Sequence, residues 1–150
     1  MTTKKNSIAE ISISYKPKKF NSPQITCSDD AKDLLLQFFP DETIALQERF
    51  VVGYLNRANR LIGVYEVSKG GITGTVVDIR LILSVALKSA ATGIILAHNH
   101  PSGNLNPSDN DKSITEKINH ACLFMDIKLL DHLIFSPSRS FLSFVEEGLL

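Results

Sequence analysis

The sequence predicts an α/β fold, in which a mixed β-sheet is flanked by about three helices. Short runs rich in β-branched and aromatic residues alternate with stretches whose apolar residues recur at helical spacing. Residues 93–97 form a wholly apolar run, which is typical of a central strand buried on both faces. The chain of 150 residues is long enough for one domain that buries about two-thirds of its unfolded surface.

The first 28 residues are expected to form a partly flexible N-terminal extension. Residues 11–15 alternate between apolar and polar side chains and could add an edge strand, whereas 16–23 have the composition of a linker. Lysines gather in this extension, and a solvated tail explains them better than a DNA-binding arm does. We therefore place the folded domain at residues 29–150.

Capping and turn signals divide this domain into elements. Ser28-Asp29-Asp30 predicts the start of a first helix, and Pro40-Asp41 predicts its end. Asp78 is a candidate N-cap for a second helix, and a third helix follows Pro107. The predicted elements are a helix over 28–39, a hairpin of strands 47–55 and 61–67, a short strand at 72–76, a helix from 78 to 90, a strand over 93–97, a helix from 107 or 108 to 124, and strands over 127–135 and 140–144.

Composition and charge argue against several classes of protein. The 16 basic and 16 acidic residues balance, so no net positive charge draws the chain to nucleic acid or to an anionic membrane. No stretch of roughly 18 apolar residues could span a bilayer, and no apolar signal-peptide core follows Met1. Cys27 and Cys122 match no metal or redox motif. We therefore expect a cytoplasmic protein with reduced cysteines and no membrane partner.

The most informative segment is 98–111, which begins with His98 and His100 at the end of the apolar run. Alternate residues of a strand project from one face about 6.6–7 Å apart, so two imidazoles placed in this way can converge on one ion. The Gly/Asn/Pro loop that follows can bring Asp111 in as a third ligand. Two histidines and one carboxylate leave a tetrahedral Zn²⁺ with one open position, an arrangement typical of hydrolytic sites.

Each of these residues also has a purely structural interpretation. Ser108-x-x-Asp111 has the spacing of a capping box, with aspartate in place of the usual glutamate. His98 and His100 could be strand histidines whose ring nitrogens bond backbone groups. A helix cap, however, gives no reason for two histidines upstream of it, and the restricted loop can hold the two halves in a fixed geometry. The joint pattern therefore favours a metal site, with which capping can coexist.

The same segment resembles the signature of the JAMM (MPN+) metalloproteases. In that signature His-x-His-Pro precedes Ser-x-x-Asp at a fixed spacing, and here the two motifs are 98–101 and 108–111. The surrounding residues are similar to one branch, the RadC-like JAB domain proteins of bacteria. The residues that carry this likeness are Ala97 to Gly103, Pro107-Ser108 and Leu130-Asp131-His132. The resemblance covers residues 25–150 and implies the JAB/MPN (cytidine-deaminase-like) fold.

The resemblance also implies a role for each residue of the motif. His98, His100 and Asp111 would hold one Zn²⁺, which lowers the pKa of a bound water. Ser108 would donate a hydrogen bond to the tetrahedral oxyanion. A glutamate on the first strand after the first helix would accept the proton of the water and pass it to the leaving amine.

Two glutamates could be this base. Glu48 shares its predicted strand face with apolar residues, among which an acid is out of place unless it is functional. Glu66 also shares its face with apolar residues, so the pattern alone does not separate the two. Position after the first helix favours Glu48, as the family would have it, while a strand-end acid in water is its structural alternative.

Asp131 and His132 are further candidates near the end of the chain. Histidines that bind zinc commonly donate their other N–H to a carboxylate or a carbonyl group, so Asp131 could support a ligand from behind. A packing or hydrogen-bonding role explains both residues equally well.

We therefore expect a zinc-dependent hydrolase of JAMM type that cleaves a peptide or isopeptide-like amide in a peptide or protein substrate. The alternative is a DNA-repair-associated accessory protein of RadC type without catalysis. Longer RadC proteins carry a helix-hairpin-helix segment, which we do not expect in so short a chain, and the neutral charge does not favour DNA contact. A closed structural metal site is disfavoured because no further Cys or His is spaced to fill the fourth position. Neither the substrate nor the oligomeric state follows from these residues.

Overall fold

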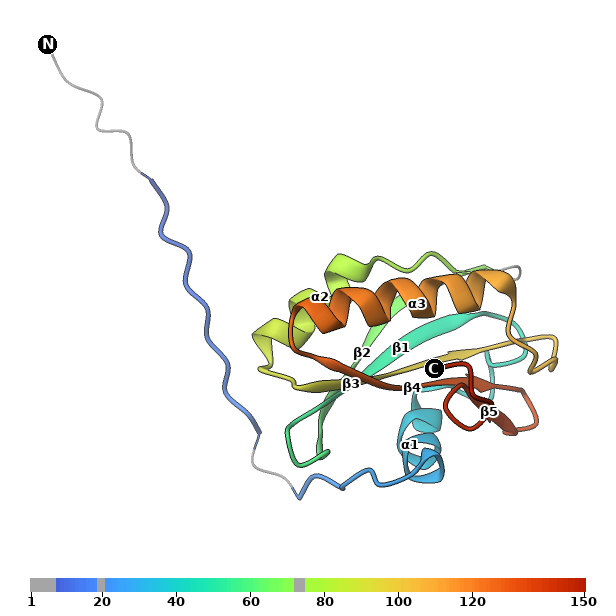
Figure 1. Ribbon diagram of the computed structural model, residues 1–150. Helices are drawn as coiled ribbons and strands as arrows, with labels where there is room; N and C mark the ends of the chain where they lie inside the picture. The colour runs from blue at the N-terminus through green and yellow to red at the C-terminus, as the bar shows by residue number, and fades with distance from the viewer. Residues whose placement is uncertain (1–7, 19–20, 72–74) are drawn as a thin grey trace, which may run out of the picture.

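A five-stranded mixed sheet lies between helices in the computed structural model, which describes residues 8–18, 21–71 and 75–150 (Figure 1). This arrangement confirms the predicted α/β fold class. The elements are α1 (Ser28–Leu35) with a 3₁₀ turn η1 (Leu36–Phe38), β1 (Arg49–Leu55), β2 (Leu61–Lys69), α2 (Ile79–Lys88), β3 (Gly93–Asn99), α3 (Asp109–Phe124), β4 (Lys128–Phe135) and β5 (Phe141–Ser143).

The strands follow the order β2-β1-β3-β4-β5 across the sheet. β3 and β4 are parallel, and the other neighbouring strands are antiparallel. The predicted central strand is β3, and every one of its residues is buried. Phe50 of β1 and Ile134 of β4 pair with His98 on either side, so the end of β3 lies inside the sheet rather than at its edge.

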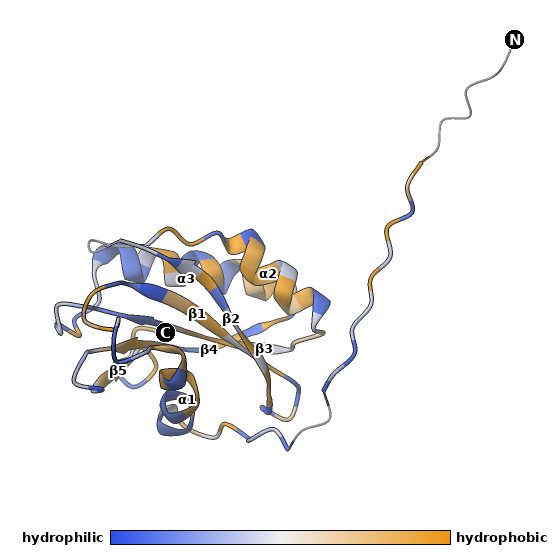
Figure 2. Ribbon diagram, turned by 180° about the vertical axis from the view of Figure 1, so that it is seen from behind, coloured by the Kyte–Doolittle hydropathy of each residue, from blue (hydrophilic) through white to orange (hydrophobic). Residues whose placement is uncertain are grey.

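Helices cover both faces of this sheet. α2 and α3 lie on one face and α1 lies on the other (Figure 1). Alternate residues of β3 join the two apolar clusters: Ile94 and Leu96 pack on the side of α2 and α3, while Ile95 and Ala97 pack on the side of α1. Figure 2 shows the apolar residues concentrated along these strands and along α2. The strand period of two therefore sends His98 and Asn99 to opposite faces.

The predicted elements are observed with shifted boundaries. The first helix ends its α-helical part at Leu35 and continues as the 3₁₀ turn, and Asp78 caps α2 by accepting the N–H of Arg80 at 2.9 Å. β1 begins at Arg49 rather than at residue 47, which leaves Glu48 just ahead of the strand. The strand predicted at 72–76 lies partly outside the described residues, and Thr75 and Val76 are not in a strand.

The described part of the N-terminal extension has two regions of different character. Residues 8–18 are extended and exposed, and the edge strand considered for 11–15 is not seen there. The start of this segment projects away from the sheet (Figure 1), while Tyr15, Lys16 and Lys18 line a hollow beside β2. Closer to the domain, Gln24 forms an isolated bridge with Arg60, and Ile25 is buried in the cluster under α1. None of the helices in the described residues is long and apolar enough to cross a membrane.

α1 packs tightly against β1 because glycine stands at the contact. A Cβ atom added to Gly53 would lie 3.1 Å from the Cδ2 atom of Leu35, closer than side chains normally pack. Leu35 itself has no exposed surface and lies among the residues that fill the space beneath the sheet.

We expect Leu35→Ala to lower the free energy of unfolding by about 2–5 kcal/mol, because the substitution removes buried methyl groups and leaves a cavity. Leu87→Ala on α2 is the matched control: this leucine is 53% exposed, and its truncation is expected to change stability by less than about 0.5 kcal/mol. Urea unfolding of both variants measures the difference. Equal losses in the two variants would contradict the assigned core.

Candidate metal centre

Three side chains from two neighbouring elements converge at one end of the sheet. β3 carries His98 near its end and His100 directly after it, and the first turn of α3 brings Asp111 opposite them. The Nε2 atom of His98 lies 3.3 Å from Oδ1 of Asp111, and the Nε2 atom of His100 lies 3.2 Å from Oδ2. The two Nε2 atoms are 3.0 Å apart.

These distances fit a tetrahedral metal ion. An ion with bonds of about 2.0–2.1 Å holds its ligand atoms roughly 3.3 Å apart. The two Nε2 atoms lie near this separation, each faces a different oxygen of Asp111, and one ligand atom from each residue lies within 4.8 Å of the others. Two imidazoles and one carboxylate are also a donor set that zinc accepts, whereas Ca²⁺ and Mg²⁺ prefer oxygen atoms throughout. The structure thus brings together His98, His100 and Asp111 as a group that could hold one metal ion. We call these three side chains the ligand cluster.

Asp111 serves the helix and the cluster at the same time. Its Oδ2 atom accepts the backbone N–H of Ser108 at 2.7 Å, and the hydroxyl oxygen of Ser108 accepts the N–H of Asp111 at 3.0 Å. This is the predicted capping box, and Asp111 still faces both histidines. Partial burial raises the pKa of Asp111, but its hydrogen bonds to His100 and His98 outweigh burial and hold that pKa well below the usual range.

The ring of His100 is oriented by the loop that follows it. Its Nδ1 atom donates to the carbonyl oxygen of Asn104 at 2.6 Å, which leaves the lone pair of Nε2 facing the cluster. When His100 is protonated, its Nε2–H donates to Asp111; this hydrogen bond is the main reason that the pKa of His100 is raised, and burial opposes it. The Gly/Asn/Pro loop therefore fixes a ring nitrogen as well as bridging the two motifs.

His98 is supported by His132 rather than by a carboxylate. The Nδ1 atom of His98 lies 2.8 Å from Nε2 of His132, whose Nδ1 atom in turn lies 2.6 Å from the hydroxyl oxygen of Thr115. His132 is fully buried and stacks on Phe144, with ring centroids 4.6 Å apart. Burial, and then the neighbouring His98, lower the pKa of His132 well below its ordinary value, so this ring is neutral.

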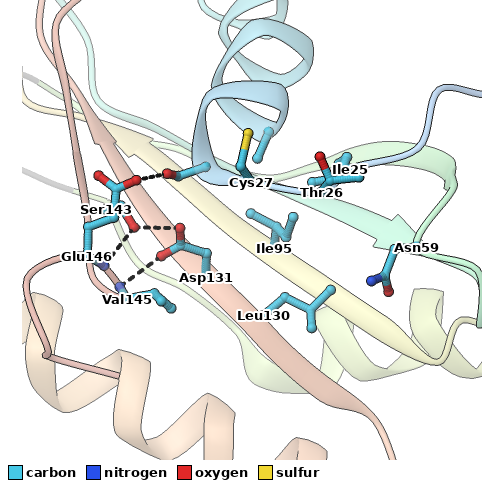
Figure 3. Close-up of a pocket in the computed structure, with 12 residues that line it drawn as sticks. Ile25, Thr26, Cys27, Asn59, Ile95, Leu130, Asp131, Ser143, Val145 and Glu146 are labelled. Carbon is cyan, nitrogen blue, oxygen red and sulfur yellow. Dashed lines mark hydrogen bonds between the residues drawn. The ribbon is translucent and has the colours of Figure 1, made fainter.

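Asp131 points to the other side of the sheet, away from this cluster. Figure 3 shows its carboxylate in the wall of a cavity of about 360 Å³ beside α1. It accepts the hydroxyl of Ser143 at 2.6 Å and the backbone N–H groups of His132 at 2.7 Å and Val145 at 3.2 Å. Burial raises the pKa of Asp131 despite these bonds. The contact of Asp131 with the ligand cluster is therefore indirect, through the backbone of His132.

Of the two glutamates, the structure places Glu48 near the cluster. Glu48 is half-buried and lines a cleft together with His100, Ser108 and Asp111. Burial raises its pKa, while the two histidines of the cluster lower it. Glu66 instead lies on the edge strand β2 and pairs with Arg49 of β1, at 2.5 Å between Oε2 and the guanidinium.

The cleft has a polar side and an apolar side. The polar part measures about 400 Å³ and is lined by Ser102, Asn104, Asn106 and Asn110 beside the ligand cluster. The more apolar part measures about 230 Å³, and its lining adds Phe50, Val76, Val77 and Ile114 to the polar residues Glu48, Thr75, Asn110 and Asp111. Glu48 and Asp111 belong to both parts, so the cluster stands where the two parts meet.

Two residues at this site had no assigned role before the structure was known. Asn99 is fully buried, donates its amide to the carbonyl oxygens of Ile44 at 2.8 Å and Gln47 at 2.9 Å, and accepts the N–H of Arg49 at 2.8 Å. It thereby holds the segment that carries Glu48. Thr115 lies four residues after Asp111 on the buried face of α3. A polar residue within an apolar helix stripe is a sequence signal that could have identified Thr115 as part of the site.

Comparison with known proteins identifies similar sequences. Residues 25–149 match the family model described as RadC-like JAB domain. A UPF0758 protein of Flavobacterium johnsoniae is 46% identical over 126 residues, which are 84% of this chain and 53% of the relative. A UPF0758 protein of Porphyromonas gingivalis is 40% identical over 104 residues, which are 69% of this chain and 46% of the relative. The chain spans about half the length of these curated relatives.

We expect Asn99→Ala to lower the free energy of unfolding by about 2–4 kcal/mol, since it leaves buried backbone groups around Glu48 without partners. Asn21→Ala, at an exposed asparagine, is the control and should change stability by less than about 0.5 kcal/mol. Thermal unfolding compares the two variants. A stability loss no larger than that of the control would show that Asn99 does not hold this segment.

Proposed function

The chain belongs to the RadC-like JAB domain family, and we propose that it is a zinc-dependent hydrolase that cleaves a peptide or isopeptide-like amide bond. One observation carries the proposal: His98, His100 and Asp111 converge, at separations that suit a tetrahedral ion, beside a cleft that Glu48 also lines. Three protein ligands leave one position of such an ion open, which distinguishes catalytic from structural zinc sites.

In this proposal His98 and His100 would hold the metal through Nε2, and Asp111 would hold it through its carboxylate. A zinc ion held there would supply Lewis-acid chemistry, which lowers the pKa of a water molecule to about 7 and polarises a carbonyl group. Glu48 accepts a proton from the attacking water and passes it to the nitrogen of the leaving amine. Its half-buried position supports this role, because burial raises the pKa of the carboxyl group toward the range useful for proton transfer.

Ser108 is proposed to stabilise the oxyanion of the tetrahedral intermediate. Its hydroxyl oxygen already accepts the N–H of Asp111, and no acceptor for its hydrogen is present among the described residues. That hydrogen is therefore available to a substrate oxygen in the cleft. Donors of this kind contribute roughly 2.7–4 kcal/mol to the stabilisation of the transition state.

The two parts of the cleft suit an extended substrate peptide that crosses the ligand cluster. The asparagine and serine side chains of the polar part can bond the backbone of a peptide on one side of the scissile bond. On the other side, Phe50, Val76, Val77 and Ile114 offer room for one apolar side chain. We therefore propose a peptide or protein substrate with an apolar residue next to the cleaved amide.

We expect the purified wild-type protein to bind about one equivalent of zinc, and the variant His98→Ala/His100→Ala to bind none at this site. Two ligands of three are lost, so the remaining carboxylate cannot retain the ion. Metal analysis after dialysis against a weak chelator measures this. His120→Ala, at an exposed histidine on α3, is the control and should retain the metal. Full zinc content in the double variant would remove the proposed site.

We expect Glu48→Gln to retain zinc but to lower the rate of amide hydrolysis by about 10²–10⁴-fold, because glutamine cannot accept the proton. Glu66→Gln is the matched control, since Glu66 lies on the edge strand and pairs with Arg49. The probe is a fluorogenic library of peptides and lysine-linked isopeptides, read by newly formed amines. An unchanged rate in Glu48→Gln would remove Glu48 as the base, and no cleavage by zinc-loaded wild type would remove the proposed activity.

A further inference from the structure

A line of buried polar groups runs behind the ligand cluster and connects two of its residues, His98 and Asp111. It starts at Nδ1 of His98, crosses the ring of His132, reaches the hydroxyl of Thr115 and ends at the backbone carbonyl oxygen of Asp111. The successive separations are 2.8, 2.6 and 2.6 Å. His98, His132 and Thr115 are each at most 2% exposed, so water does not compete for these bonds.

When both imidazoles are neutral, each ring has one N–H and the threonine has one O–H, so two arrangements of hydrogens can make the contacts between His98, His132 and Thr115. In the outward arrangement, His98 Nδ1–H donates to His132, His132 Nδ1–H donates to Thr115, and the Thr115 hydroxyl donates to the carbonyl of Asp111. In the inward arrangement, the Thr115 hydroxyl donates to Nδ1 of His132, and His132 Nε2–H donates to Nδ1 of His98, which then carries its own hydrogen on Nε2. The carbonyl oxygen of Asp111 can only accept, so this arrangement loses the hydrogen bond between Thr115 and Asp111.

The two arrangements have opposite consequences for a metal ion. The outward arrangement leaves the lone pair of His98 Nε2 free, 3.3 Å from the Asp111 carboxylate, where it can bind a metal. The inward arrangement places a hydrogen on that same nitrogen, directed at Asp111, and blocks it. Among the described residues no carboxylate lies behind His98 to fix the position of its hydrogen, since Asp131 accepts hydrogen bonds from Ser143 and Val145 on the other side of the sheet (Figure 3).

We propose that His132 and Thr115 are positioning residues that select the metal-binding tautomer of His98, and that metal binding sets the whole line in the outward arrangement. This inference rests on the metal site of the proposed function but does not depend on hydrolysis. Thr115 is the end that decides the direction. Its hydroxyl accepts from His132 only while its own hydrogen is directed to the carbonyl of Asp111.

The variant Thr115→Val tests this with little change in side-chain shape. Without the hydroxyl, the outward arrangement leaves the N–H of His132 without an acceptor, whereas the inward arrangement leaves only a ring lone pair unpaired. A buried N–H without a partner is the costlier of the two. We therefore expect the inward arrangement to dominate in Thr115→Val, and zinc to bind about 10–100-fold more weakly, the usual effect of losing a partner behind a ligand.

The readouts are zinc affinity from competition with a chelator and histidine tautomers from ¹⁵N NMR of the full chain. In zinc-loaded wild type we expect His98, His132 and His100 all to carry hydrogen on Nδ1. In metal-free Thr115→Val, His132 should carry it on Nε2, while His100 keeps Nδ1–H through Asn104 and serves as an internal reference. Thr115→Ser restores a hydroxyl and should restore both readouts, and Ser113→Ala on the exposed face of α3 controls for the helix.

A second variant guards against a folding defect. His132→Phe keeps an aromatic ring against Phe144 but removes the acceptor for His98, and it should also weaken zinc binding. Wild-type zinc affinity in both Thr115→Val and His132→Phe would overturn the inference, as would an Nε2–H tautomer of His132 in the zinc-loaded protein. Zinc binding with these tautomers but without hydrolysis would remove the proposed activity alone, and a wild type that binds no zinc would remove both proposals.

Discussion

Burial of β3 on both faces is the constraint on which the candidate site depends. A strand surrounded in this way cannot end in polar side chains unless each of them finds a partner, because an unpaired buried polar group costs on the order of 1–3 kcal/mol. His98 and Asn99 stand at that end, one on each face. His98 organises the side of α3 through His132 and Asp111, and Asn99 organises the side of α1 through the backbone of 44–49. The same strand therefore positions both the candidate metal ligands and the segment of the proposed base.

Asp111 meets a demand of the helix and a demand of the candidate metal site with one carboxylate. The first turn of a helix presents unpaired N–H groups, which a carboxylate stabilises, and a metal site needs a carboxylate that stays ionised. One side chain meets both demands, because a carboxylate has enough lone pairs for a backbone N–H and for the cluster. The low pKa of Asp111 follows from this concentration of donors, despite partial burial. Capping and ligation thus reinforce each other at this position.

Much of the fold and part of the site were predictable from local sequence. The apolar run at 93–97 and the Ser-x-x-Asp spacing each depend on near neighbours, and the central strand and the capping box were both correctly expected. The roles of Asn99 and Thr115 were not predicted, since their partners are set by how β1, α3 and β4 pack. The direction of Asp131 follows from the strand period of two, because Asp131 and His132 are consecutive residues of β4 and therefore point to opposite faces. Which of the two faces the cluster depends on the register with β3, which shifts between Ile94 and Ile95 and is not visible in local sequence.

The choice of a neutral histidine behind His98 has a consequence for the proposed chemistry. A carboxylate in that place would draw the imidazole hydrogen toward itself and make the ring a stronger donor to the metal. A neutral ring gives less charge to the ligand, so an ion held by His98, His100 and Asp111 would keep more of its positive charge. That charge is what lowers the pKa of water and attracts a developing oxyanion. The orientation of Asp131 away from the cluster therefore leaves the neutral pair of His132 and Thr115, rather than a carboxylate, to orient His98.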